Sequence, residues 1–281
     1  MFAGLPRQCG SFLLTGRKTA LVDAGPSVTV DNVLAGMEAR GVGPEDLDYI
    51  LLTHFHLDHA GGASVLLDRC PNAMIVVDER SAKYMADPAR LVSSAAKSLG
   101  DIAPDYGTML PVPPERIIPM TDRFVLQLGP NRRMTAYHTP GHSGGHFVFL
   151  EEPQRALFCG DCLGHYIEEC DYVYPATPAP EFRLDKSIAS ARRLLKLNPA
   201  VLLFPHYGSS SNPAAVVEQF ERQVRRSVEL AESLPPEERT AKRLGGLLFD
   251  DIPGVSDAEA SLLRGILEVN AAGVLHYVTR Q

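Results

Sequence analysis

The sequence lacks a long apolar run and lacks any surplus of basic residues. No stretch of about eighteen apolar residues occurs, so the sequence predicts no membrane-spanning helix. Asp and Glu total 34 against 27 Lys and Arg, which gives a net charge of −7. A nucleic-acid-binding surface normally carries a basic patch. We therefore expect neither a membrane nor a nucleic acid among the partners of this protein.

Cysteine is scarce and odd in number. Five cysteines cannot all pair within one chain, which favours a reducing compartment. The segment from Met1 to Gln8 has no basic region followed by an apolar one, the pattern of a secretory signal. Together these features favour a cytoplasmic location.

The chain does have enough apolar residues for a sizeable core in one large domain. It has 281 residues, of which 45% are hydrophobic. Apolar strand patterns alternate with amphipathic helical ones, which predicts an α/β fold. We expect strands at residues 11–15, 19–23, 49–53, 74–77, 124–128, 133–137, 146–150, 156–159 and 201–204, and helices at 30–40, 63–69, 185–197, 214–234, 237–247 and 257–270.

A dense cluster of metal-ligand residue types follows the apolar run 49–52. His54, His56, Asp58 and His59 lie within six consecutive residues, and Zn²⁺ binds imidazole nitrogen and carboxylate oxygen. His54 and His56 are two residues apart, which suits a loop leaving a strand rather than a helix, where paired ligands stand four apart. The two neighbouring pairs indicate two separate ions.

Three more candidate ligands follow other expected strands. His142, Asp161 and His206 come after apolar runs, where rigid sheets often carry functional side chains. We interpret all three as metal ligands because their contexts agree with that of the first cluster. The remaining histidines beside apolar strands are interpreted as structural or surface residues: His138, His146, His165 and His276.

These motifs resemble those of the metallo-β-lactamase-fold hydrolases. The order is His-x-His-x-Asp-His, then Thr-Pro-Gly-His-Ser, then Gly-Asp, then a late His, and it covers about residues 10–210. The resemblance implies a four-layer αβ/βα sandwich with a binuclear site, two zinc ions being usual and iron or manganese occurring in some members. It implies one metal at His54, His56 and His142, a second at Asp58, His59 and His206, and Asp161 as the bridge.

The resemblance also sets the expected domain organisation. Residues 1–212 would form the catalytic domain with a helical insertion at 79–116, and residues 213–281 a helical C-terminal extension packed on it. A homodimer is a possible assembly.

The expected reaction is hydrolysis of a small-molecule substrate. Two cations about 3.5–4 Å apart lower the pKa of a bridging water, and the resulting hydroxide attacks an electrophilic centre. Asp58 is the expected catalytic residue because it can also orient that nucleophile, and His165 or Tyr166 can protonate the leaving group. We expect a small ester, thioester or lactone as substrate.

The sequence differs from the motifs of several subfamilies of this family. It is therefore not assigned to either the glyoxalase II-like or the lactonase-like enzymes. The Gly-Cys-Gly-Arg segment of glyoxalase II enzymes and persulfide dioxygenases is missing after Asp161, and Gly164 stands where quorum-quenching lactonases have tyrosine. Antibiotic-hydrolysing members lack the bridging aspartate, and flavodiiron proteins replace the residue at His56 by glutamate. Two alternatives remain. The first is a mononuclear iron oxygenase of the persulfide-dioxygenase type, whose iron ligands would be Asp161 and neighbours of His54 or His59. The second is a non-catalytic ligand-binding protein.

Two further segments have ambiguous patterns. Cys159 and Cys162 form a C-x-x-C around Asp161, which we interpret as packing rather than as a redox switch. The segment 166–182 is rich in aromatic residues and proline. With residues 79–116 it is predicted to wall an apolar substrate pocket, to which we assign His165, Tyr166 and Tyr172.

Overall fold

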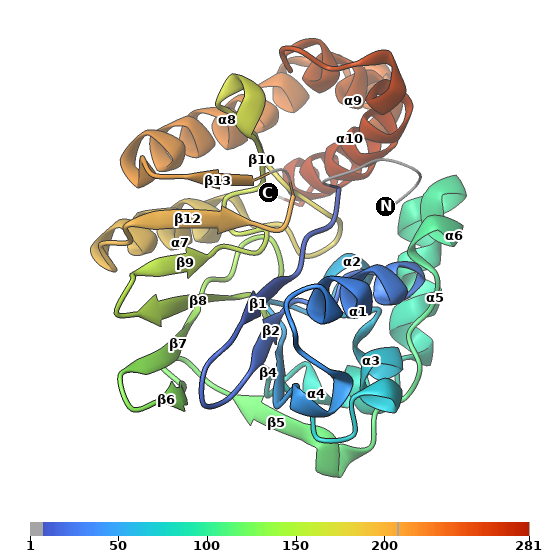
Figure 1. Ribbon diagram of the computed structural model, residues 1–281. Coiled ribbons are helices and arrows are strands. Elements are labelled where there is room, and N and C mark those ends of the chain that lie inside the picture. Colours follow the sequence, from blue (N-terminus) through green and yellow to red (C-terminus); the bar gives the residue numbers. More distant parts are fainter. Residues whose placement is uncertain (1–7, 207, 281) are drawn as a thin grey trace.

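The computed structural model describes residues 8–206 and 208–280, which form two β-sheets packed face to face (Figure 1). The first sheet has the order β1-β2-β3-β4-β5, and its last four strands are parallel. Its strands are β1 Phe12–Leu14, β2 Ala20–Val22, β3 Tyr49–Leu51, β4 Met74–Asp78 and β5 Ile117–Met120.

The second sheet has the order β13-β12-β9-β8-β7-β6, and a separate hairpin is made by β10 and β11. The strands of the sheet are β6 Val125–Gly129, β7 Arg132–His138, β8 Phe147–Glu152, β9 Ala156–Phe158, β12 Val201–Phe204 and β13 Gly208–Ser210. The hairpin consists of β10 His165–Ile167 and β11 Tyr172–Tyr174.

Helices cover the outer face of each sheet. On the first sheet, α1 Val30–Glu38 and α3 Ala63–Arg69 share an apolar cluster with the strands. On the second sheet, α7 Leu184–Lys196 and α8 Pro213–Ser233 do the same. The other helices are α2 Leu57–Ala60, α4 Ala82–Ala86, α5 Ala89–Leu99, α6 Ala103–Tyr106, α9 Ala241–Asp250 and α10 Asp257–Val278. None of the helices within the described residues is long and apolar enough to cross a membrane.

Strand alternation explains the layered packing. Ile50 on β3 faces the helices of the first sheet, while its neighbour Leu51 packs between the two sheets against Met134 and Phe149. Both faces of the central strands are therefore buried, as their continuous apolar runs require. The predicted four-layer α/β sandwich with a helical C-terminal region is confirmed.

Several boundaries differ from the sequence-based expectation. Residues 57–60 form the short helix α2 rather than a loop, so Asp58 and His59 lie on one helical turn. Helix α9 begins at Ala241 rather than 237, because Thr240 caps its first turn by accepting the backbone N–H of Arg243. Helix α10 extends to Val278. Strands β5, β10, β11 and β13 were not expected, and three of these four are only three residues long.

Candidate metal centre

The first set of candidate ligands is a group of three imidazoles. His54 and His56 lie between β3 and α2, and His142 lies in the turn between β7 and β8. Nε2 of His54 is 2.9 Å from Nδ1 of His56, and Nε2 of His142 is 3.2 Å from the first of these atoms and 2.9 Å from the second. The structure thus brings three nitrogen atoms together from two distant parts of the chain.

The second set lies beside the first and contains both carboxylates. Nε2 of His59 is 3.6 Å from Oδ2 of Asp58 and 3.3 Å from Oδ1 of Asp161. Nε2 of His206, which follows β12, is 3.7 Å and 3.5 Å from the same two oxygen atoms. The ligand atoms of this set all lie within 4.8 Å of one another.

Asp161 faces both sets. Its Oδ1 atom points to His59 and His206, whereas Oδ2 is 3.6 Å from Nε2 of His142. Oδ1 is buried and accepts no hydrogen bond within the described residues. A buried carboxylate oxygen without a hydrogen bond is costly, and a cation between the two sets would satisfy it.

The separations fit divalent cations. Two ligands about 2.1 Å from a tetrahedral zinc ion are about 3.4 Å apart, and the contacts within both sets span 2.9–3.7 Å. The donors are imidazole and carboxylate, so zinc, iron and manganese are all chemically acceptable. The seven predicted ligand residues therefore lie in two groups, each of which could hold a metal ion.

Hydrogen bonds from the far side of each ring orient the imidazoles. The Nδ1–H group of His54 faces the Thr53 hydroxyl at 3.1 Å, and that of His142 donates to the Ala176 carbonyl at 3.0 Å. The Nδ1–H group of His206 donates to the carbonyl of Gln8. Each of these bonds uses Nδ1 and leaves Nε2 directed at the centre, the arrangement typical of metal-bound histidine.

The histidines of the two sets have pKa values shifted in opposite directions. Burial, reinforced by the neighbouring imidazoles, lowers the pKa of His54 well below its usual value, and burial lowers the pKa of His142 to about 4. Burial also opposes the charged form of His59, but the carboxylates of Asp161 and Asp58 raise its pKa well above the usual value. The second set therefore holds protons that a bound cation would displace.

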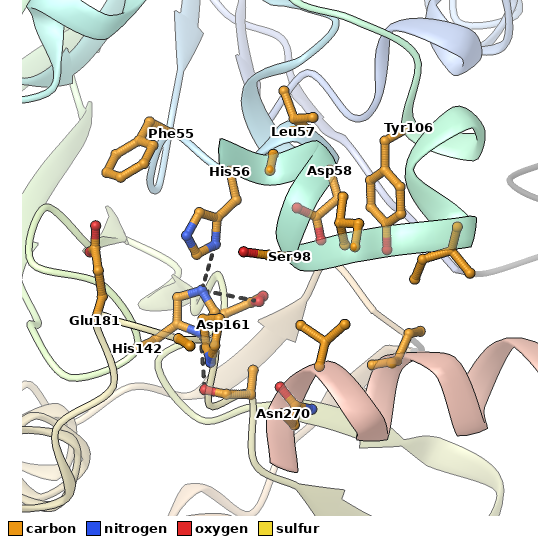
Figure 2. Close-up of a pocket in the computed structure, with 18 of the residues that line it drawn as sticks. Phe55, His56, Leu57, Asp58, Ser98, Tyr106, His142, Asp161, Glu181 and Asn270 are labelled. Carbon is orange, nitrogen blue, oxygen red and sulfur yellow. Dashed lines mark hydrogen bonds and ion pairs between the residues drawn. The ribbon is translucent and has the colours of Figure 1, made fainter. Parts of the chain in front are cut away.

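A cavity opens onto both sets (Figure 2). Its walls come from α5, α6, α10 and the segment 176–181, and its volume is about 170 Å³. His165 lines it as predicted, with Nε2 3.8 Å from Oδ2 of Asp161 and its ring stacked on that of His206.

Tyr166 and Tyr172 require a correction, since neither is among the residues that line this cavity. Tyr166 follows His165 on β10, and successive strand residues point to opposite sides. Its ring stacks on Phe204 in the core, and its hydroxyl donates to Asp171 at 2.8 Å. Tyr172 packs against a separate apolar cluster with Leu248 and Phe249. The aromatic side chains of the cavity wall, besides the histidines, are instead Phe55 and Tyr106, the latter on α6.

Three residues around the ligands were not assigned to the site from the sequence, although His146 was interpreted as a structural or surface histidine. Asp23 accepts a hydrogen bond from Nδ1–H of His59 at 2.9 Å and from the backbone N–H of Thr53 at 2.8 Å. Nε2 of His146 accepts the backbone N–H of Asp161 at 3.0 Å. Tyr106 lies beside Asp58 in Figure 2. Asp23 carried the same signal as the ligands, a carboxylate just after an apolar strand.

The two cysteines around Asp161 are free thiols, and both are buried. Cys159 belongs to the apolar cluster beneath the second sheet, and burial raises the pKa of Cys162 to about 12. A thiol with so high a pKa stays protonated at neutral pH and is a poor nucleophile and metal ligand. These surroundings agree with a packing role.

Comparisons with known proteins agree with this geometry. The sequence model of the metallo-beta-lactamase superfamily matches residues 4–206. A metallo-beta-lactamase fold-containing protein of Sulfurisphaera tokodaii, ST1585, is 32% identical over 70% of this chain and 72% of its own length. The crystal structure of ST1585 superposes with a TM-score of 0.72 at 28% identity, covering 96% of this chain and 93% of that one.

Two further relatives have names that state a reaction. The atrochrysone carboxyl ACP thioesterase of Aspergillus fumigatus is 28% identical over 54% of this chain and 28% of its own length. The hydroxyacylglutathione hydrolase of Pectobacterium atrosepticum is 26% identical over 61% of this chain and 52% of its own. The matches thus cover about half, or less, of these two relatives.

Proposed function

The chain belongs to the metallo-beta-lactamase superfamily, and from this premise we propose that it is a binuclear metal-dependent hydrolase of a small ester, thioester or lactone. The observation that supports this most directly is the position of Asp161 between two sets of imidazoles, with one buried oxygen that accepts no hydrogen bond among the described residues. The relatives named as a thioesterase and a hydroxyacylglutathione hydrolase cleave carbonyl compounds, which favours a carbonyl ester or thioester.

The residues divide into ligands and groups that face the substrate. His54, His56 and His142 would hold one cation, Asp58, His59 and His206 the other, and Asp161 both. Two bound cations, zinc in this proposal, supply a water of lowered pKa and polarise the carbonyl under attack. The supporting hydrogen bonds hold each ligand ring in place, so little reorganisation is needed during the reaction.

Two side chains of the cavity serve the proton transfers in this proposal. The carboxylate of Asp58 faces the cavity and can accept a hydrogen bond from the attacking water. His165 has its Nδ1 atom 2.7 Å from the Tyr174 hydroxyl, which fixes the ring while Nε2 faces the bridging carboxylate. A neutral imidazole with Nε2–H in this position can donate a hydrogen bond to the leaving group, and the proton itself can come from the water that is consumed in the reaction.

Metal analysis combined with turnover tests the proposal. The protein is stripped with a chelator and reloaded separately with zinc, iron and manganese, and hydrolysis of p-nitrophenyl hexanoate is measured. We expect two metal ions per chain and activity only in the loaded forms. His142→Asn should reduce metal content, whereas His138→Gln, four residues away and outside both sets, is the matched control.

Other results would favour the alternatives. One iron per chain without ester hydrolysis would support a mononuclear oxygenase. Full activity in the stripped protein would rule out a metal-dependent reaction altogether.

A further inference from the structure

Two helices, α5 and α10, each contribute one face to the cavity beside the candidate metal centre. Leu91, Ala95, Leu99 and Ile102 recur at helical spacing along α5 and the turn that follows it, and all line the cavity. Ile266, Val269 and Asn270 face it from α10. Residues spaced by three or four positions lie on one side of a helix, so the two helices present apolar faces to the same space.

The volume limits the group that fits between these helices. The cavity holds about 170 Å³, and an apolar cavity of about 150 Å³ accommodates one benzene molecule. A chain or ring of about six carbon atoms therefore fills it. Larger groups have to project past the exposed residues of α5, such as Ser98.

Outside the two metal sets, the charges that line the cavity disfavour the binding of an anionic group. Besides the two carboxylates of the metal sets, Glu181 lines the cavity, and its Oε2 atom accepts the backbone N–H of Gly144 at 2.7 Å. Among the described lining residues none is Lys or Arg. A substrate carboxylate enclosed here would lose its hydration next to another carboxylate, which is strongly unfavourable.

One polar group of the lining has an unused hydrogen-bond donor. Asn270 is 5% exposed, and its Oδ1 atom accepts the backbone N–H of Thr177 at 2.8 Å. Its Nδ2 atom is buried and has no partner among the described residues. Figure 2 shows Asn270 on the side of α10 that faces the cavity. Leaving such a donor unpaired is costly, and a substrate oxygen would pair with it once the amide group turns toward the cavity.

We infer that the substrate of the proposed hydrolysis is an uncharged ester or thioester whose compact apolar acyl group, of about six carbon atoms, lies between α5 and α10 while Asn270 donates to one of its oxygen atoms. The inference rests on the proposed function for the reaction itself. The binding of the acyl group is a property of this cavity and can be measured separately.

Matched substrates test the charge preference. We compare p-nitrophenyl hexanoate with mono-p-nitrophenyl adipate, which has a carboxylate at the end of the same six-carbon chain. The expected kcat/KM ratio is at least about 100 in favour of the neutral ester, because a desolvated unpaired charge costs several kcal/mol. Ser98→Lys should lower this ratio at least tenfold, and Ser98→Gln, of similar length without charge, should keep it. Equal rates for both esters in the wild type would overturn the inference.

Binding of compounds that cannot be hydrolysed tests the specificity of the cavity separately from the proposed hydrolysis. 2-Octanone and 7-oxooctanoate cannot be hydrolysed, and calorimetry on the metal-loaded protein measures their affinities. If 2-octanone binds more tightly than 7-oxooctanoate but neither ester is hydrolysed, the inferred specificity of the cavity is supported and the proposed function is overturned. Equal affinities would overturn the specificity even if hydrolysis is observed.

Substitutions of Asn270 test the hydrogen bond. Asn270→Asp keeps an oxygen for the Thr177 N–H group and removes the donor, whereas Asn270→Leu removes both. Both variants should lose about tenfold in kcat/KM for the hexanoate ester, mainly through KM, the signature of lost uniform binding. If Asn270→Asp retains the wild-type KM, Asn270 only anchors Thr177, and its assignment as a donor is wrong.

Discussion

At the scale of single residues, the two carboxylates of the metal sets have different surroundings. The side chain of Asp161 is 4% exposed and lies between the sets, whereas that of Asp58 is 19% exposed and faces the cavity. Asp58 can therefore contact both a metal ion and the attacking water. Asp161 is placed to bridge the two ions of the proposed site.

We predict that Asp58→Ala nearly abolishes hydrolysis while the protein remains folded. The substitution removes a ligand and the orienting group together, and loss of a supporting residue alone commonly costs 10–100-fold, so we expect a loss of more than about 100-fold in kcat. Circular dichroism checks the fold. Asp31→Ala is the control, because that carboxylate is 91% exposed on α1. Turnover near the wild-type rate in Asp58→Ala would remove Asp58 from the mechanism.

Asp23 gives a prediction about metal affinity rather than rate. It holds the Nδ1–H group of His59, and Asn in its place still accepts from Thr53 but lacks the negative charge. We expect Asp23→Asn to weaken metal binding about 10–100-fold, as for other partners of metal-bound histidine.

Chelator competition measures this affinity. The matched control is Asp78→Asn, since Asp78 ends the neighbouring strand β4 and bonds Arg80 and Ser81 instead. If both variants bind metal equally, the contact between Asp23 and His59 does not tune the site.

At the scale of elements, α10 packs closely on the segment that borders the cavity. A Cβ atom on Gly273 would overlap the carbonyl oxygen of Thr177 and lie 2.7 Å from the carbonyl carbon of Pro178. On the same helix, a Cβ atom on Gly265 would meet Ile102 at an ordinary 3.5 Å.

We therefore predict opposite effects for two alanine substitutions on α10. Gly273→Ala should force the helix away from residues 176–180, lowering stability by about 1–3 kcal/mol and raising KM. Gly265→Ala should be neutral or stabilising by up to about 1 kcal/mol, because alanine favours the helix. Urea unfolding and steady-state kinetics measure both effects. A tolerant Gly273→Ala would show that α10 does not fix the cavity wall.

The elements also show what the sequence could predict. The ligand positions were predictable because polar ligand types directly after apolar strands are rare for any other reason. Tyr166 was predicted to line the cavity because it lies close to Asp161 along the chain. Side chains alternate along β10, however, and that of Tyr166 points into the core. The three-residue strands β10 and β11 are too short for any periodicity to be detected. Asp23, in a left-handed conformation at φ 56°, resembles an ordinary turn residue in sequence.

At the scale of the whole molecule, the candidate ligands and one wall of the cavity come from different regions of the chain. The seven candidate ligands all lie within residues 4–206, the region that matches the superfamily. The apolar wall contributed by α10 lies beyond that region. Under the inference above, substitutions in α10 should change the acyl groups that the protein accepts without removing any candidate ligand.

The metal ions should also join the two halves of the sandwich. His54, His56, Asp58 and His59 follow the first sheet's β3, while His142, Asp161 and His206 follow strands of the second. A ligand that binds only the folded state at 1,000 times its Kd stabilises it by about 4 kcal/mol. Because 1 kcal/mol shifts the melting temperature of a protein of this size by about 2–4 °C, we expect chelation to lower it by about 10 °C. Differential scanning calorimetry with and without chelator measures the shift, and Asp161→Asn should reduce it because the bridge is weakened. Identical melting curves before and after complete metal removal would show that the sheets associate without help from the ions.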